Sequence, residues 1–119
     1  MIDLLNHLNV DYAVFGNHEF DFGSEILLER IKESNFKWVG SNVKDTKTGQ
    51  VLGGGIDTLI FSIGNDIKIG MFGVCTQETP QLSFPGPGVV FEDIIETSKV
   101  NTNFFKRIIS IPYSWPCIS

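Results

Sequence analysis

The chain has few cysteines, a deficit of basic residues and no long apolar run. Its 119 residues include only Cys75 and Cys117, which form neither a metal-binding spacing nor a disulfide framework. We expect Cys75 to be a small buried residue within a strand. Acidic residues outnumber basic residues by 14 to 9, which argues against a nucleic acid polymer or an anionic membrane surface as a partner.

Membrane-spanning and export signals are also missing. No run approaches the roughly 18 apolar residues of a membrane span, and the first residues lack the basic and then apolar build of a signal peptide. The composition instead favours a globular core, since 42% of the residues are hydrophobic and 12% are aromatic. A chain of this length corresponds to about one small domain.

Residues 16–23 concentrate the polar chemistry of the chain. They read Gly-Asn-His-Glu-Phe-Asp-Phe-Gly, between the apolar run 12–15 and a helix-like run that starts near Ser24. An amide, an imidazole and two carboxylates therefore occupy five consecutive positions bracketed by glycines. A glycine-bounded turn at the carboxyl end of a buried strand is a common place for ligand chemistry in α/β folds. The stretch is a candidate active-site loop.

The residue types in this loop suit metal and phosphate chemistry. The amide oxygen of Asn17 is a neutral, hard ligand for a divalent cation. A protonated His18 could contact a phosphate oxygen or a leaving group, and the carboxylate of Asp21 would raise the pKa of that imidazole and select its tautomer. The alternative is that Asn17 and Asp21 only form Asx turns and that His18 is a surface histidine.

Two segments resemble one enzyme family. Residues 16–19 resemble the Gly-Asn-His-(Glu/Asp) motif of the calcineurin-like metallophosphoesterases, and the longer stretch 16–23 resembles their 5'-nucleotidase branch. Residues 73–80 resemble a Gly-(hydrophobic)-x-Thr-x-Glu-Thr-Pro stretch of the same branch. The resemblance covers residues 2–102. It implies hydrolysis of a phosphate monoester, a 5'-nucleotide above all, at a centre of two divalent ions (Zn, Mn, Mg or Fe).

The resemblance also implies residue roles and a fold. Asn17 would be a metal ligand, His18 would stabilise the phosphoryl transition state, and Asp21 would orient His18. The implied fold class is α/β: a fragment of the metallophosphoesterase sandwich, in which helices flank mixed β-sheets. The family is often extracytoplasmic, but nothing in this sequence assigns the chain to a compartment.

The order of patterns in the sequence agrees with an α/β fold. Apolar spacing predicts helices over 2–9, 24–34 and 94–103, with Ser24 as an N-cap and Asp93 and Glu96 as a capping box. Strands over 12–15 and 38–43 complete a βαβ unit. Residues 58–63 and 67–74 predict a hairpin with its turn at 64–66. Loops are expected at 44–55, with residues 53–55 as the most mobile part, and at 84–88.

Most of the family's metal ligands have no counterpart in this chain. The resembled centre also uses an Asp-x-His, a Gly-Asp and a Gly-His-x-His, none of which occurs here, and His7 is expected to face solvent. We therefore divide the chain into a partial catalytic domain (1–102) and a divergent tail (103–119), and expect exposed apolar faces. Besides the enzyme, two readings stay open: a non-catalytic fragment or regulatory remnant, and an enzyme completed by a complementing chain.

Overall fold

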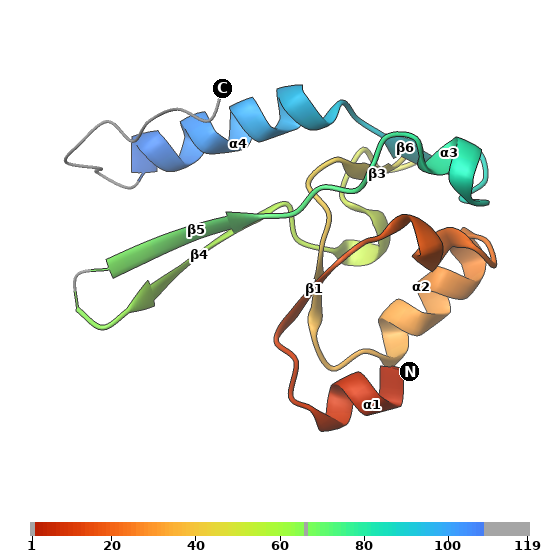
Figure 1. The fold of residues 1–119 in the computed structure, drawn as a ribbon, viewed down its shortest axis with the longest axis horizontal. Coiled ribbons are helices and arrows are strands. Elements are labelled where there is room, and N and C mark those ends of the chain that lie inside the picture. Colours follow the sequence, from red (N-terminus) through yellow and green to blue (C-terminus); the bar gives the residue numbers. More distant parts are fainter. Residues whose placement is uncertain (1, 66, 109–119) are drawn as a thin grey trace.

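A computed structural model describes residues 2–65 and 67–108, which form helices and three two-stranded sheets (Figure 1). The predicted α/β class is confirmed. In chain order the elements are α1 (Ile2–His7), β1 (Tyr12–Val14), the 3-10 helix η1 (Asn17–Phe20), α2 (Ser24–Glu33), β2 (Lys37–Val39), β3 (Val43–Asp45), the 3-10 helix η2 (Leu52–Gly54), β4 (Thr58–Ile63), β5 (Ile67–Phe72), α3 (Thr79–Leu82), β6 (Val89–Phe91) and α4 (Ile94–Ile108).

The predicted βαβ unit is present. Strands β1 and β2 pair in parallel, with Ala13 opposite Trp38, and α2 connects them. The prediction of one strand over 38–43 is wrong, because β2 ends at Val39 and β3 starts only at Val43. Gly40 lies between them against the Phe15 ring, where an added Cβ would lie 2.5 Å from the nearest ring atom. The Phe15 ring can pack this closely only because this position lacks a side chain.

The predicted loop 44–55 is more ordered than its composition indicated. Its start belongs to β3, which pairs antiparallel with β6, a short strand that the sequence pattern did not reveal. Its end forms η2, in which Leu52 is buried and Gly53 adopts a φ of 66°. A Cβ on Gly53 would lie 2.7 Å from Ile31 of α2. Gly53 and Gly54 are exposed, but Gly53 packs against α2.

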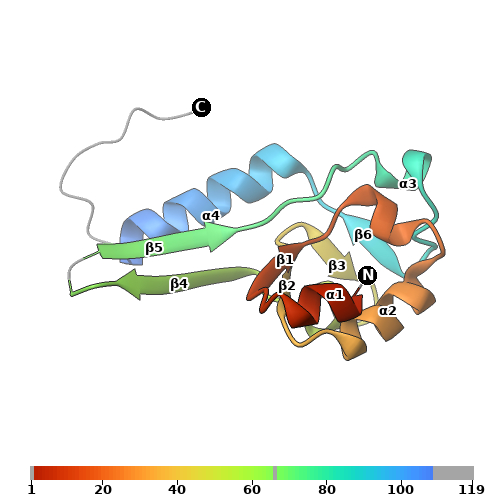
Figure 2. The ribbon, with the colours of Figure 1, turned by 60° about the horizontal axis from the view of Figure 1, so that its bottom comes forward.

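The hairpin of β4 and β5 is confirmed, and α4 lies along it in both ribbon views (Figures 1 and 2). The predicted start of α4 is also confirmed, because Asp93 Oδ1 accepts a hydrogen bond from the Glu96 N–H at 2.9 Å. The helix extends to Ile108 and not to 103. The division at 102/103 therefore falls inside a helix and stays a prediction. Cys117 and residues 109–119 lie outside the described part.

Aromatic rings form much of the core between the βαβ unit and the later strands. Phe15 stacks on Trp38 with ring centroids 5.0 Å apart, and Phe20 meets Phe91 edge-on at 5.2 Å. Cys75 is buried among them as predicted, but it follows β5 and is not part of a strand. The buried apolar cluster comprises Phe15, Phe20, Leu27, Phe36, Trp38, Val43, Val51, Leu52, Cys75 and Val89.

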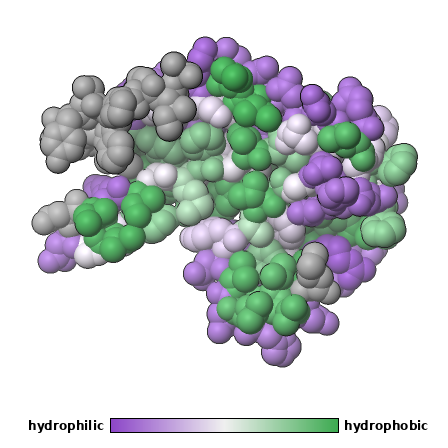
Figure 3. Space-filling model, in the orientation of Figure 1, coloured by the Kyte–Doolittle hydropathy of each residue, from purple (hydrophilic) through white to green (hydrophobic). Residues whose placement is uncertain are grey.

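Apolar side chains also remain at the surface, as expected. Figure 3 shows hydrophobic patches over α1 and at the end of the hairpin. Leu4 and Leu8 are more than half exposed, and so are Ile63 and Ile67 beside the hairpin turn. A surface of this kind is typical of contact with further protein. Among the described helices, none has the length and apolarity needed to cross a membrane.

Candidate functional site

The loop 16–23 is a 3-10 turn tied to the end of β1. The Gly16 N–H donates to the carboxylate of Glu19 at 3.1 Å, and the Glu19 N–H donates to the Gly16 carbonyl at 3.3 Å. Phe20 is completely buried and anchors the turn in the core. This reciprocal pairing holds Asn17 and His18 on the outer side of a rigid turn.

The exit from the turn depends on Gly23. Its φ of 88° lies in the left-handed region, and its N–H donates to the Phe20 carbonyl at 3.1 Å. Gly23 also occupies the N-cap position of α2, so the prediction that Ser24 is the cap is wrong: Ser24 is the first helical residue. A glycine is favoured here because other residues would be strained at this φ.

The structure brings His18 and Asp21 together. His18 Nδ1 lies 3.0 Å from Asp21 Oδ2, and the two side chains are 78% and 40% exposed. With the proton on Nδ1 the imidazole donates this bond. The three-residue spacing across the turn is what places the ring over the carboxylate. The imidazole is thereby held by one nitrogen while most of its surface faces solvent.

Ser83 is a third member of this arrangement that the sequence did not reveal. It is buried, and its hydroxyl donates to Asp21 Oδ1 at 2.7 Å. The neighbouring Phe84 N–H donates to the Phe20 carbonyl at 3.2 Å, so the whole segment is fastened to the turn. The hydrogen bond from Ser83, and then that from His18, hold the pKa of Asp21 below its ordinary value. No signal in a single sequence points to Ser83, since 62 residues separate it from Asp21.

Asn17 is the remaining residue that the sequence singled out. It is half-buried at the start of η1, and within residues 2–65 and 67–108 its side chain makes no hydrogen bond. Its amide oxygen is therefore available to a ligand. His7, by contrast, is exposed on α1 as expected, with Nδ1 2.8 Å from the Asp3 carbonyl oxygen, and it takes no part in the site.

The turn borders a concave surface. A cavity of about 590 Å³ lies between α1, β1 and α2, with His18 and Glu19 among its lining residues. Most of the other lining side chains are apolar, including Phe22 and Ile26, and the lining also holds Arg30 in an ion pair with Glu33 at 2.6 Å. The candidate site thus lies beside a hollow large enough for a small molecule.

Comparisons with known proteins show what the chain as a whole resembles. The chain is 35% identical to the 5'-nucleotidase of Homo sapiens and 33% identical to the snake venom 5'-nucleotidase of Gloydius brevicauda, over 92% and 96% of its length. The solved NAD nucleotidase (NadN) of Haemophilus influenzae superposes with a TM-score of 0.80 at 30% identity over 90% of the chain. The chain matches part of a 5'-nucleotidase-type metallophosphoesterase domain. No family model matches it.

A second solved structure widens the match within the metallophosphoesterases. The calcineurin-like phosphoesterase YfkN of Bacillus subtilis superposes with a TM-score of 0.69 at 26% identity over 91% of the chain, and the chain covers 34% of that structure. The chain covers a smaller share of the other proteins named above. The chain spans 20% of the human relative, 21% of the snake venom relative and 21% of NadN.

The described residues of this partial metallophosphoesterase domain do not fit a metal centre by themselves. Within residues 2–65 and 67–108, no group of three or more His, Cys, Asp or Glu side chains has the arrangement needed to hold a metal ion. Two divalent ions need several ligands each, whereas Asn17 is a single candidate. Any such centre would need ligands in addition to the described ones.

Proposed function

We propose that this chain belongs to a phosphohydrolase that cleaves phosphate monoesters, with a nucleotide as substrate and a nucleoside and phosphate as products. The observation that carries the proposal is the pair of hydrogen bonds that the Asp21 carboxylate accepts, one from the Ser83 hydroxyl and one from His18 Nδ1. The relatives named 5'-nucleotidase support the choice of a nucleotide.

Within this proposal His18 contacts the substrate and Asp21 positions it. Because Nδ1 faces the Asp21 carboxylate, Nε2 is the nitrogen that can donate to a phosphate oxygen or to the leaving group. An N–H held in this orientation can stabilise negative charge as it develops on the transferring group. Ser83 holds Asp21 in place, so that the ring keeps one orientation.

Asn17 is proposed as one ligand to a divalent metal ion, and the resemblance implies two such ions. Since the described residues supply no complete centre, the remaining ligands would lie outside the described residues or on a complementing chain. Within this chain, Asn17 would bind a metal ion, His18 would contact the substrate and Asp21 would orient His18.

The test is phosphate release from AMP with added manganese, zinc or magnesium, measured for the 119-residue chain and for any longer form that contains it. His18→Ala should lower turnover of the active form by about a hundredfold or more, as expected for loss of a group acting directly in the transition state. His7→Ala is the matched control, because His7 is an exposed histidine on α1, outside the turn 16–23.

The alternative function is a non-catalytic remnant that keeps the fold and binds a ligand or a partner. The incomplete ligand set favours it for the chain in isolation. Elemental analysis separates the two readings: stoichiometric metal with His18-dependent turnover in a longer form supports the enzyme. Turnover that is the same in His18→Ala and in the unaltered protein would refute the role of His18 and, with it, the proposed site.

A further inference from the structure

A series of polar contacts leads from the Asp21 carboxylate into the core, beyond the Ser83 hydroxyl. Ser83 follows the short helix α3, and its N–H donates to the Thr79 carbonyl at 2.8 Å at the end of that helix. Because α3 has only four residues, its own hydrogen bonds cannot hold it in place. The position of the Ser83 hydroxyl therefore depends on what fixes Thr79.

Thr79 is completely buried, and its hydroxyl has two partners. The hydroxyl donates to the Thr76 carbonyl at 2.6 Å, so its one hydrogen is used in that bond. The Cys75 sulfur lies 3.3 Å from the same hydroxyl oxygen, and the thiol is then the donor. Burial raises the pKa of the Cys75 thiol, which keeps the hydrogen that this contact needs. The Thr79 side chain is thus held from two directions.

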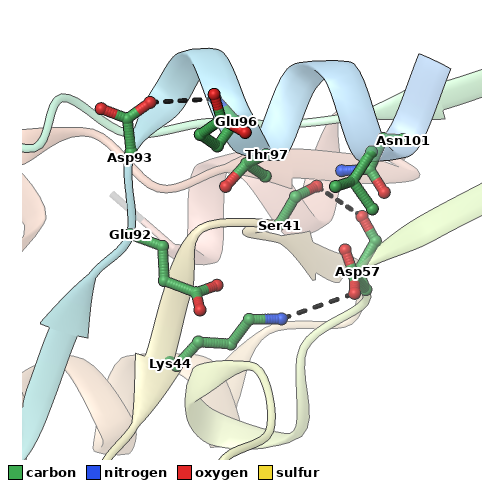
Figure 4. Close-up of a pocket in the computed structure, with 9 residues that line it drawn as sticks. Ser41, Lys44, Asp57, Glu92, Asp93, Glu96, Thr97 and Asn101 are labelled. Carbon is green, nitrogen blue, oxygen red and sulfur yellow. Dashed lines mark hydrogen bonds and ion pairs between the residues drawn. The ribbon is translucent and has the colours of Figure 1, made fainter. Parts of the chain in front are cut away.

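The segment that carries Cys75 is itself fixed by two consecutive buried residues, Ser41 and Asn42. The Ser41 hydroxyl accepts from the Gly73 N–H at 3.2 Å and donates to the Asp57 carbonyl at 2.5 Å, a contact drawn in Figure 4. The Asn42 side chain accepts from the Cys75 N–H at 2.8 Å and donates to the Cys75 carbonyl at 2.7 Å. The chain that leaves β5 is therefore held in the core before it reaches α3.

These contacts form one path from the core to the turn 16–23. We propose that Thr79 is a positioning residue for the hydrolysis proposed above: its hydroxyl fixes α3 so that the Ser83 hydroxyl meets the Asp21 carboxylate. This role rests on the proposed function, because Thr79 acts only through Asp21 and the His18 imidazole and does not touch the substrate. A residue that only stabilised the core would leave the Asp21 carboxylate unaffected when its hydroxyl is removed.

The first experiment removes the hydroxyl alone. Thr79→Val has nearly the same shape as the native side chain, whereas Thr79→Ser keeps the hydroxyl and loses the methyl group. In the 119-residue chain, an NMR titration of the Asp21 side-chain carboxyl should show its pKa raised towards 3.8 in Thr79→Val, by at least about half of the rise in Ser83→Ala. Thr79→Ser should keep the midpoint of the unaltered chain. An unchanged midpoint in Thr79→Val, or an equal rise in both variants, would overturn the proposal.

Phe105→Leu is the control for a general loss of stability, because Phe105 is buried where α4 packs on the hairpin. It should lower the free energy of unfolding and leave the Asp21 midpoint unchanged. An equal rise of the midpoint in Phe105→Leu would attribute the shift to general destabilisation and refute the role of Thr79. A Thr79→Val chain that fails to fold while Phe105→Leu folds would show that Thr79 supports the whole fold and not the Ser83 contact, which would also overturn the proposal.

The second experiment measures turnover in a longer, active form that contains this chain, with His18→Ala and Thr79→Val side by side. Thr79→Val should lower kcat about tenfold with KM nearly unchanged, because the imidazole is kept and only its orientation is lost. Unchanged kcat in Thr79→Val, while His18→Ala is impaired, would refute the role of Thr79 and leave the proposed function intact. Unchanged turnover in His18→Ala would refute the proposed function, and with it the catalytic role of Thr79.

Discussion

Ser83 donates its hydroxyl hydrogen to Asp21 Oδ1 at 2.7 Å, across 62 residues of chain. The other oxygen of the same carboxylate lies 3.0 Å from His18 Nδ1. The carboxylate is therefore held at both oxygens, one on the buried side and one on the side that faces solvent. Ser83, which is distant in the sequence, therefore helps to set the orientation of the His18 ring through Asp21. Substitutions in this chain can test that role.

Ser83→Ala should raise the pKa of Asp21 towards its ordinary value of 3.8, because the hydrogen bond from Ser83 is the largest cause of its lowering. The pKa should stay somewhat below that value while the bond to His18 persists. The measurement is an NMR titration of the Asp21 side-chain carboxyl carbon. Ser62→Ala, at an exposed position of β4, is the control, and an unchanged Asp21 midpoint in Ser83→Ala would contradict the assigned cause.

The same lowered pKa predicts how stability depends on pH. A carboxyl whose pKa is lower in the folded than in the unfolded state stabilises the fold above the unfolded pKa, and this contribution is lost as pH falls through the folded pKa. Asp21→Asn should therefore reduce the free energy of unfolding at about pH 7 and have much less effect at about pH 2. Urea unfolding at both pH values measures this.

The control for that experiment is Asp11→Asn, which removes an exposed carboxylate just before β1. Its effect on the free energy of unfolding should be small at both pH values. A loss in Asp21→Asn that is equally large in acid and at neutral pH would mean that the carboxylate charge is not what stabilises the turn.

Asn42→Ala should be among the more destabilising single changes. The buried side chain donates to the carbonyl oxygens of Cys75 at 2.7 Å and Glu92 at 3.0 Å, and it accepts from the Cys75 N–H at 2.8 Å. Its loss leaves the buried N–H and carbonyl of Cys75 without these partners and removes one from the part-buried Glu92 carbonyl. We expect the free energy of unfolding to fall by about 3 kcal/mol in a urea titration. Asn103→Ala, exposed on α4, should cost under about 0.5 kcal/mol, and similar losses in both would contradict this account.

Gly70→Ala should loosen α4 from the hairpin. A Cβ at Gly70 would lie 2.5 Å from the Phe105 ring, so the ring must move, at a cost of about 1–3 kcal/mol in the free energy of unfolding. Gly88→Ala is the control, since no atom lies within 4 Å of its added Cβ.

A double-mutant cycle tests the Gly70 contact directly. Combining Gly70→Ala with Phe105→Leu should cost less than the sum of the two single changes, because the smaller side chain leaves room for the added methyl group. Strict additivity would show that the helix does not pack on the hairpin at this point.

Much of the local structure could be predicted from the sequence. The parallel pairing around α2, the hairpin of β4 and β5 and the start of α4 at Asp93 all follow from patterns spanning a few residues. The errors occur where contacts between residues far apart in the sequence determine the local structure. Strand β2 ends at Val39, before Gly40 and the Phe15 ring that packs against it, and β6 is paired with β3, more than 40 residues earlier in the chain.

The sequence by itself determined the chemistry of the turn 16–23, since His18 and Asp21 are three residues apart and any tight turn brings them together. Only the tertiary structure decided that Ser83, 62 residues away along the chain, supports Asp21. The physical reason is the sequence separation of the contacting residues. Spacing along the chain specifies which residues are neighbours within a turn or a helix. Contacts across tens of residues depend on how separate elements pack, and one sequence carries no direct record of that packing.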